Sequence, residues 1–452
     1  MRTRLAISPA TLPTNMLPDR FDWGCATSSF QIEGASREDG RVPSIWDDFC
    51  AQPGRIQDGS DGTVACDHYH CHAADIRALA ELGFKHYRFS IAWPRVVKTN
   101  NTLNSAGMDF YKRLLDTLDE HGIVPNATLF HWDLPSHLEG GWLNRDTAYR
   151  FADYAHLVAQ QLGDRLPRVA TLNEPWCCSF LGYDLGIFAP GQKDRELALS
   201  AAHHLVLAHG LGVQAWRSEQ TNTQIGIVLN PELCDPASAD PADTQAANLA
   251  QYERNECFLN PLFGREWPQE LLTQMGSRVA DRWAGDAKIC AQPLDFIGFN
   301  YYTRSMGRAP QTPDEAIRGY AYVPPAAGKT LTDIGWEVYP EGLARIVKKL
   351  SDGWPLPPIW IAENGMADNT PVVNGVCDDE RRCRYLQSHF ESLSDCIAQG
   401  ADVRAYYLWS LLDNFEWAHG YSQRFGIVHV DFETQKRTYK KSALMMQSLL
   451  RG

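Results

Sequence analysis

The chain has 452 residues, a length that suits two or three ordinary domains or one elaborated eight-stranded α/β barrel. Hydrophobic residues make up 44% of the composition and charged residues 21%, so the chain can bury a sizeable core. The formal net charge is −13, which disfavours polyanionic partners. We therefore expect no binding to nucleic acid or to an anionic membrane surface.

The N-terminal stretch and the cysteines bear on the compartment of the protein. Residues 1–18 contain three prolines and some basic side chains but no apolar run of signal-peptide length. Nowhere do eighteen apolar residues follow one another, so we expect no transmembrane helix. The twelve cysteines have no framework spacing. These features predict a loosely ordered lead-in over 1–18, reduced thiols and a cytoplasmic location, and they leave the oligomeric state open.

From residue 19 onward, short apolar runs alternate with longer segments of helical periodicity. The runs expected as strands are Trp23–Thr27, His86–Ala92, Val124–Phe130, Val169–Asn173, Gln224–Asn230, Phe296–Tyr301, Pro358–Glu363 and Ala405–Ser410. The segments expected as helices are Ala73–Leu82, Gly107–His121, Thr147–Leu162, Leu197–Trp216, Leu343–Leu350 and Glu380–Gln399. Because eight strands alternate with helices and the composition does not change between the halves, we predict one (β/α)8 TIM barrel over residues 19–452.

Three stretches have weak order signals and are rich in Pro, Asp, Gly or Ala: Cys234–Thr244, Gly307–Thr330 and Ala367–Cys377. We expect them to be surface insertions. In a barrel of this kind, extended loops at the C-terminal ends of the strands carry the active site.

Two of the predicted strands end on a glutamate in a similar way. P-I-W-I-A-E-N-G places Glu363 at the end of a buried apolar run, and V-A-T-L-N-E-P places Glu174 at the end of another. Both strand ends lie on the same rim of a barrel, so the two carboxylates face one cavity. Such a pair is the minimal equipment for glycoside hydrolysis, in which one carboxylate attacks or stabilises the sugar and the other carries a proton. Burial and a neighbouring negative charge can divide these two roles.

With these motifs in place, the chain resembles glycoside hydrolase family 1, the retaining β-glycosidases of the β-glucosidase type. The resemblance runs from Phe21 to about Tyr439 and is carried by seven motifs in the family's order. They are F-D-W-G-C-A-T-S-S-F-Q-I-E-G from Phe21, Y-R-F-S-I-A-W-P-R from Tyr87, H-W-D-L-P from His131, T-L-N-E-P from Thr171, F-N-Y-Y from Phe299, I-A-E-N-G from Ile361 and W-S-L-L-D-N-F-E-W from Trp409.

The resemblance implies a role for each matching residue. Glu174 corresponds to the acid/base and Glu363 to the nucleophile, supported by Arg88, Asn300 and Tyr302. A fixed cation such as Arg88 keeps a neighbouring carboxylate ionised. The expected substrate-binding residues, which bind sugar hydroxyls, stack on the ring or shape the aglycone entrance, are Gln31, His131, Trp132, Asn173, Trp336, Trp409, Glu416, Trp417 and Phe425.

The substrate class follows from Glu416. Family members that act on 6-phosphorylated glycosides lack this glutamate, and a carboxylate here repels a phosphate dianion. The resemblance therefore implies a retaining exo-β-glucosidase that needs no cofactor and acts on unphosphorylated β-linked oligosaccharides or aryl and alkyl β-glycosides, with tolerance of β-galactosides or β-fucosides. The ranking of glucose, galactose, fucose and mannose stays open.

The chain departs from the family at two positions near the site. Ala362 precedes the expected nucleophile where many members have Thr, and Phe188 stands where a His is common, which makes the aglycone side more apolar. C-D-H-Y-H-C-H, residues 66–72, suggests a metal site by composition only. Its residues are spaced too tightly for a standard zinc site, so we expect no metal there.

Two alternatives to hydrolysis stay open. The same site serves transglycosylation if an alcohol outcompetes water at the glycosyl-enzyme. A catalytically silent glycan-binding barrel is the alternative from a different class, although such relatives would be expected to have lost one of the two carboxylates.

Overall fold

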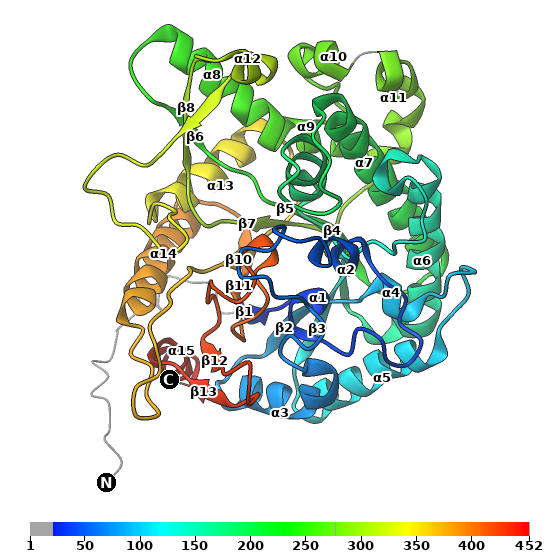
Figure 1. Ribbon diagram of the computed structural model, residues 1–452, viewed down its shortest axis with the longest axis vertical. Coiled ribbons are helices and arrows are strands. Elements are labelled where there is room, and N and C mark those ends of the chain that lie inside the picture. Colours follow the sequence, from blue (N-terminus) through cyan, green and yellow to red (C-terminus); the bar gives the residue numbers. More distant parts are fainter. Residues whose placement is uncertain (1–20, 276, 452) are drawn as a thin grey trace.

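Eight parallel strands close into a barrel at the centre of the computed structural model (Figure 1). The structure describes residues 21–275 and 277–451, so the lead-in expected over 1–18 lies outside the described residues. Around the barrel the strands follow the order β1-β11-β10-β7-β5-β4-β3-β2. Their bounds are β1 (Asp22–Ala26), β2 (His86–Ser90), β3 (Val124–Phe130), β4 (Arg168–Asn173), β5 (Gln224–Leu229), β7 (Phe296–Asn300), β10 (Ile359–Asn364) and β11 (Val403–Trp409).

The predicted barrel is confirmed, and each predicted strand agrees with an observed strand to within two residues at either end. The agreement has a simple physical basis. A strand of a parallel barrel is buried on both faces and therefore has a continuous apolar sequence. All six residues of β10 are buried, including its apolar run Ile359–Ala362 and the two polar residues that follow.

Helices surround the barrel (Figure 1). They are α1 (Ser29–Ile32), α2 (Ile45–Cys50), α3 (His68–Glu81), α4 (Trp93–Val96), α5 (Ser105–Glu120), α6 (Asp146–Leu162), α7 (Arg195–Ser218), α8 (Pro241–Gln251), α9 (Cys257–Leu262), α10 (Gln269–Met275), α11 (Ser277–Cys290), α12 (Pro313–Arg318), α13 (Glu341–Gly353), α14 (Glu380–Ala398) and α15 (Lys441–Arg451). Shorter 3-10 segments are η2 (Gly141–Leu143), η3 (Gly163–Arg165) and η6 (Trp417–His419), and η4 (Cys177–Asp184) and η5 (Tyr252–Glu256) are π-helical.

The amphipathic pattern of α13 shows how these helices dock. Leu343, Ile346, Val347 and Leu350 are buried, and their spacing places them on one face. All six predicted helices are present, but α3 begins five residues earlier than predicted, at His68. Its first turn has polar contacts in place of apolar periodicity, since the His68 ring lies 2.9 Å from a carboxylate oxygen of Asp75.

Two of the expected surface insertions contain ordered structure. β6 (Cys234–Pro236), β8 (Ser305–Arg308) and β9 (Ala321–Val323) form a small sheet, which lies beside α8 and α12 in Figure 1. These strands have three or four residues, too few to show a hydrophobic period in the sequence. A further two-stranded sheet pairs β12 (Val428–Val430) with β13 (Arg437–Tyr439).

The structure bears on the state of the cysteines and on the length and apolar character of the helices. All twelve cysteines lie within it and are free thiols. Among residues 21–275 and 277–451, no helix combines the length and the apolar character needed to cross a bilayer.

The tight packing at the end of β10 yields a stability prediction. A Cβ atom added at Gly365 would lie 1.8 Å from the carbonyl oxygen of Trp409. Gly365→Ala must therefore displace backbone, and we expect it to lower the free energy of unfolding by about 1–3 kcal/mol in urea titrations. Gly353→Ala is the matched control, because a Cβ there meets no atom within 4 Å. Equal stability of the two variants would contradict the packing described here.

Candidate active site

The C-terminal ends of the barrel strands surround a cavity of about 470 Å³, a volume suited to a small organic ligand. The side chains predicted for the site line this cavity, apart from Arg88 and Gln31, which lie behind other residues of the wall. The lining residues from that prediction are His131, Trp132, Asn173, Glu174, Asn300, Tyr302, Trp336, Glu363, Trp409, Glu416, Trp417 and Phe425.

Glu363 lies near the end of β10 and is almost completely buried. Arg88, from β2, donates a hydrogen bond from Nη1 to Oε1 of Glu363 over 2.6 Å. The hydroxyl of Tyr302, just beyond β7, donates to the other carboxylate oxygen over 2.6 Å. Each oxygen of Glu363 thus has one strong donor, and one of these donors is a buried cation.

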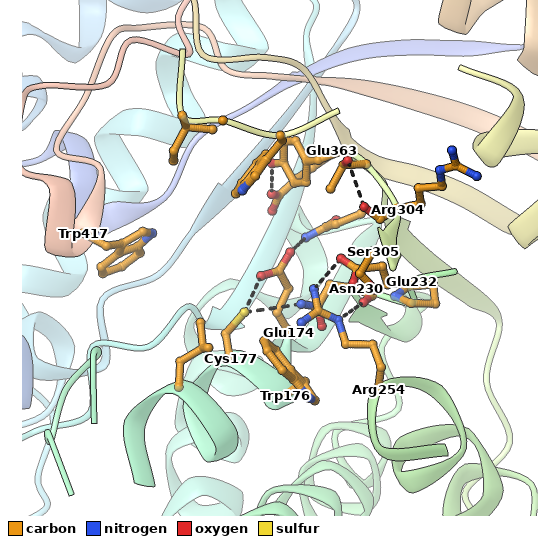
Figure 2. A pocket seen from close by; sticks show the side chains of 18 of the residues that line it. Glu174, Trp176, Cys177, Asn230, Glu232, Arg254, Arg304, Ser305, Glu363 and Trp417 are labelled. Carbon is orange, nitrogen blue, oxygen red and sulfur yellow. Dashed lines mark hydrogen bonds and ion pairs between the residues drawn. The ribbon is translucent and has the colours of Figure 1, made fainter. Parts of the chain in front are cut away.

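Glu174 follows β4 directly and has a left-handed backbone, with φ of +46°. Its Oε1 accepts a hydrogen bond from Nδ2 of Asn300 over 2.6 Å, and its Oε2 accepts one from Sγ of Cys177 over 3.1 Å. Within the described residues no ion pair to Glu174 is formed. The two glutamates therefore differ in kind: Glu363 contacts a cation, whereas Glu174 contacts neutral donors, one of which is the Cys177 thiol seen in Figure 2.

The two buried carboxylates influence each other electrostatically. Burial raises the pKa of Glu363 to about 7; the charge of Arg88 opposes this rise, and the charge of Glu174 adds to it. The hydrogen bonds from Arg88 and Tyr302 favour the negative charge on Glu363.

Asn173 connects several site residues through its amide. Its Oδ1 accepts from Nη2 of Arg88 over 2.7 Å and from Nδ2 of Asn300 over 3.1 Å. Its own Nδ2 lies 3.2 Å from Nε2 of His131. Burial, reinforced by the charge of Arg88, holds the pKa of His131 well below its usual range, so the ring is neutral and can accept this bond.

Aromatic rings form the remaining wall of the cavity. The rings of Trp409 and Trp417 both lie nearly parallel to that of His131, with centroids 5.8 and 5.9 Å from it and interplanar angles of 19° and 14°. Trp336 approaches Tyr302 and Phe425, with centroid separations of 5.4 and 6.0 Å. These flat apolar faces lie beside carboxylates, a combination that suits a ring bearing hydroxyl groups.

Glu416, in the loop after β11, is another carboxylate that lines the cavity. Nε2 of Gln31 lies 3.4 Å from Oε2 of Glu416 and is fixed from behind by Asn414 and the carbonyl oxygen of Phe415. Burial, then the charges of Glu363 and Glu174, raise the pKa of Glu416 to about 8. The family resemblance implied substrate binding for both Gln31 and Glu416, and the structure brings the two side chains into contact.

The comparisons with known proteins agree with this geometry. Residues 13–452 match the family described as Glycosyl hydrolase family 1. The chain belongs to this family. It is 44% identical over 448 residues to a beta-glucosidase of Agrobacterium sp., covering 98% of this chain and 97% of that protein. It is 41% identical to the bifunctional beta-D-glucosidase/beta-D-fucosidase of Bifidobacterium breve, and the match covers 95% of this chain and 97% of that protein. The solved complex of SghA from Agrobacterium tumefaciens with its substrate analog salicin superposes with a TM-score of 0.92, at 44% identity and 96% coverage of each chain.

Part of the cavity wall in this family member was not predicted from the sequence. Met306, Tyr322 and Val323, from the small sheet, line the cavity, although Gly307–Thr330 was expected to be a surface insertion. Asn230 and Cys177 also line it. Asn230 had a usable signal, since it is a polar residue at the end of a predicted strand, as Asn173 is.

The histidine-rich stretch at residues 66–72 is occupied by internal contacts. His70 lies 2.6 Å from Asp67 and 3.1 Å from Glu38, and the Cys66 thiol donates to the carbonyl oxygen of Asp413 over 3.0 Å. In the described part of the chain, no group of three or more His, Cys, Asp or Glu residues is arranged to hold a metal ion.

The raised pKa of Glu416 has a consequence for stability. The folded state holds the proton up to about pH 8, whereas an unfolded glutamate loses it above about 4.5, so wild-type stability falls as the pH rises through this window. Glu416→Gln has no proton to lose. Because Glu416 is partly open to the cavity, we expect the variant to gain only about 1–3 kcal/mol over wild type above pH 8 and nothing below pH 4.5, measured by urea unfolding.

Glu391→Gln serves as the control for this titration, because Glu391 is an exposed residue of α14. It should leave the pH dependence unchanged. A pH-independent difference between Glu416→Gln and wild type would contradict the raised pKa.

Proposed function

We propose that this chain is a retaining exo-β-glycosidase, chiefly a β-glucosidase, that hydrolyses unphosphorylated β-D-glucosides by double displacement. The observation that carries the proposal is the unequal pair of buried carboxylates, with Arg88 on Glu363 and neutral donors on Glu174. Membership of the family and the named activities of the relatives support it. We assign this activity to a catalytic domain spanning residues 19–452.

In the first step, the Glu363 carboxylate attacks the anomeric carbon while Glu174 gives its proton to the glycosidic oxygen, and the alcohol leaves. In the second step, Glu174 takes a proton from a water molecule that attacks the same carbon, and Glu363 is released as a carboxylate. Two inversions return the β configuration. Arg88 and Tyr302 support the charged form of Glu363, and Asn300 holds the carboxyl group of Glu174.

We assign the remaining side chains of the cavity to sugar and aglycone contacts. The hydroxyl ligands are Gln31, His131, Asn173 and Glu416, and the aromatic surfaces are Trp132, Trp409, Trp417 and Phe425, with Trp336 at the aglycone entrance. The proximity of Glu416 to Gln31 and the ring geometry around His131 support this assignment. Glu416 also disfavours a phosphorylated sugar by charge repulsion.

The substrates we propose are β-linked oligosaccharides and aryl or alkyl β-glucosides. Tolerance of β-fucosides is supported by the bifunctional relative from Bifidobacterium breve, and a role for aryl glucosides by the salicin complex of SghA. We also propose a cytoplasmic location, which is supported by twelve cysteines without the spacing of a disulfide framework.

Transglycosylation and a silent glycan-binding barrel are the alternatives to hydrolysis. Product analysis with added alcohols distinguishes transfer from hydrolysis, because transfer yields a new β-glucoside. Binding of β-glucosides without any release of the aglycone would favour the silent barrel.

The acid/base role of Glu174 can be tested by removing its carboxyl group. Glu174→Ala should lower kcat/KM for phenyl β-glucoside by about 10²–10⁴-fold, since proton donation to a poor leaving group contributes that much. Dinitrophenyl β-glucoside, which needs no proton, should form the glycosyl-enzyme at a nearly normal rate. Added azide should then restore turnover and yield β-glucosyl azide, identified by NMR. An α-azide, or an equal loss for both substrates, would contradict the assignment.

The contact between Tyr302 and Glu363 predicts a change in the pH profile. Removing the hydroxyl removes a donor that stabilises the charged carboxylate, so the pKa of Glu363 should rise further above its value of about 7. In Tyr302→Phe the acidic limb of kcat/KM should therefore move up by about one unit. Tyr301→Phe is the matched control, since that hydroxyl donates to the carbonyl oxygen of Tyr339. An acidic limb that stays in place in Tyr302→Phe would refute the contact's role.

A further inference from the structure

The thiol of Cys177 occupies an unusual place in the cavity wall. It lies one helical turn after Glu174, and its backbone N–H donates to the carbonyl oxygen of Glu174 over 2.9 Å. Its Sγ–H donates to Oε2 of Glu174 over 3.1 Å, and the side chain is 6% exposed. A thiol that touches a carboxylate, where both residues are buried, can affect the proton on that carboxylate.

The sulfur atom is itself held in place from behind. Nδ2 of Asn230, which follows β5, donates to Sγ of Cys177 over 3.3 Å, as the dashed lines of Figure 2 show. The carbonyl oxygen of Asn230 accepts from Nε of Arg254 over 3.0 Å. Arg254 stacks on Trp176, 3.6 Å from the ring centroid. A chain of contacts thus runs from a fixed cation through Asn230 and Cys177 to the carboxyl of Glu174.

The two oxygens of Glu174 have partners with different capabilities. Asn300 Nδ2 can only donate, so Oε1 must accept in either protonation state. Cys177 can donate through S–H or accept through sulfur. The proton of Glu174 therefore resides on Oε2, beside a partner that accommodates both the protonated and the charged carboxyl. Such a partner suits an acid that becomes a base within one turnover.

The thiol keeps its own proton in this setting. Burial raises the pKa of Cys177 well above its ordinary value, and the charge of Glu174 raises it further. Cys177 is therefore a neutral thiol that acts through hydrogen bonding and not as a nucleophile or a second base.

Other titratable groups that face Glu174 come from several elements. They are Cys178 from η4, Arg254 from η5, Tyr302 after β7, Glu363 from β10 and Glu416 after β11. Substitution of Cys177 leaves all of these charges unchanged, so a shift in the titration of the site can be attributed to the lost thiol.

We infer that Cys177, fixed by Asn230, is a positioning residue that orients the acid/base Glu174 and sets the pH at which this carboxyl loses its proton. The inference rests on the proposed function, in which Glu174 is the general acid. It assigns a part in the reaction to two side chains outside the expected catalytic set.

The test is the alkaline limb of the kcat/KM profile for phenyl β-glucoside, which reports the loss of the acid's proton. Cys177→Val replaces the sulfur with two methyl groups, a slightly larger side chain, and offers no donor to the charged carboxylate, so Glu174 should hold its proton to higher pH. We expect the limb to move up by about 0.5–1 unit, since a thiol is a weak donor to a charged group. Cys177→Ser keeps a donor and should leave the limb within about 0.2 unit of wild type.

Two further variants complete the experiment. Asn230→Ala removes the amide that holds the sulfur of Cys177 in place. It should move the alkaline limb in the same direction as Cys177→Val, by a smaller amount. Cys178→Val is the matched control, because that neighbouring buried thiol makes no hydrogen bond to Glu174. It should leave the limb in place. Thermal unfolding of each variant checks that the fold is intact. If Cys177→Val does not fold, the alkaline limbs of Asn230→Ala and Cys177→Ser provide the test.

The outcomes separate this inference from the proposed function. If the wild-type chain releases no phenol, the proposed function fails. If wild type is active but the limb of Cys177→Val coincides with it, the inference alone is overturned. It is also overturned if Cys177→Ser or Cys178→Val shifts the limb as far as Cys177→Val, because the effect then arises from packing. If Cys177→Val does not fold, an unmoved limb in Asn230→Ala overturns it.

Discussion

The arrangement of the active site depends on the buried ion pair between Arg88 and Glu363, in which Nη1 of Arg88 lies 2.6 Å from Oε1 of Glu363. Glu363 shares the cavity with other carboxylates, and burial together with the charge of Glu174 favours its protonated form, an effect that the charge of Arg88 opposes. Arg88 contacts Glu363 and also the amide of Asn173, which in turn holds Asn300 and His131. One guanidinium therefore favours the negative charge of Glu363 and fixes the orientation of its neighbours.

The closed barrel makes this arrangement achievable at a tolerable energetic cost. Glu363 and Arg88 sit on β10 and β2, which are far apart in sequence but converge on the same rim. Three residues of the cavity wall, Trp132, Glu174 and Trp417, have positive φ angles, a conformation that costs about 1–3 kcal/mol per residue for side chains other than Gly. The large apolar core beneath them offsets that cost and holds the side chains in their positions.

The barrel and most of the cavity wall were predictable because they leave strong local signals. Buried parallel strands are continuous apolar runs, and polar residues such as Glu174 and Glu363 stand out where those runs end. The small sheet was missed, since strands of three or four residues have no readable period, and with it the wall containing Met306 and Tyr322. The bond between Cys177 and Glu174 was also missed, because the sequence shows that two residues are neighbours but not which atoms meet.

The division of labour between the two glutamates is the central claim, and covalent trapping tests it most directly. Dinitrophenyl 2-deoxy-2-fluoro-β-glucoside has a good leaving group, while its fluorine slows the release of the sugar from the enzyme. Mass spectrometry of the intact chain and of its peptides should show one sugar per chain, attached to Glu363. A label on Glu174, or steady turnover of the reagent without any covalent species, would contradict the account.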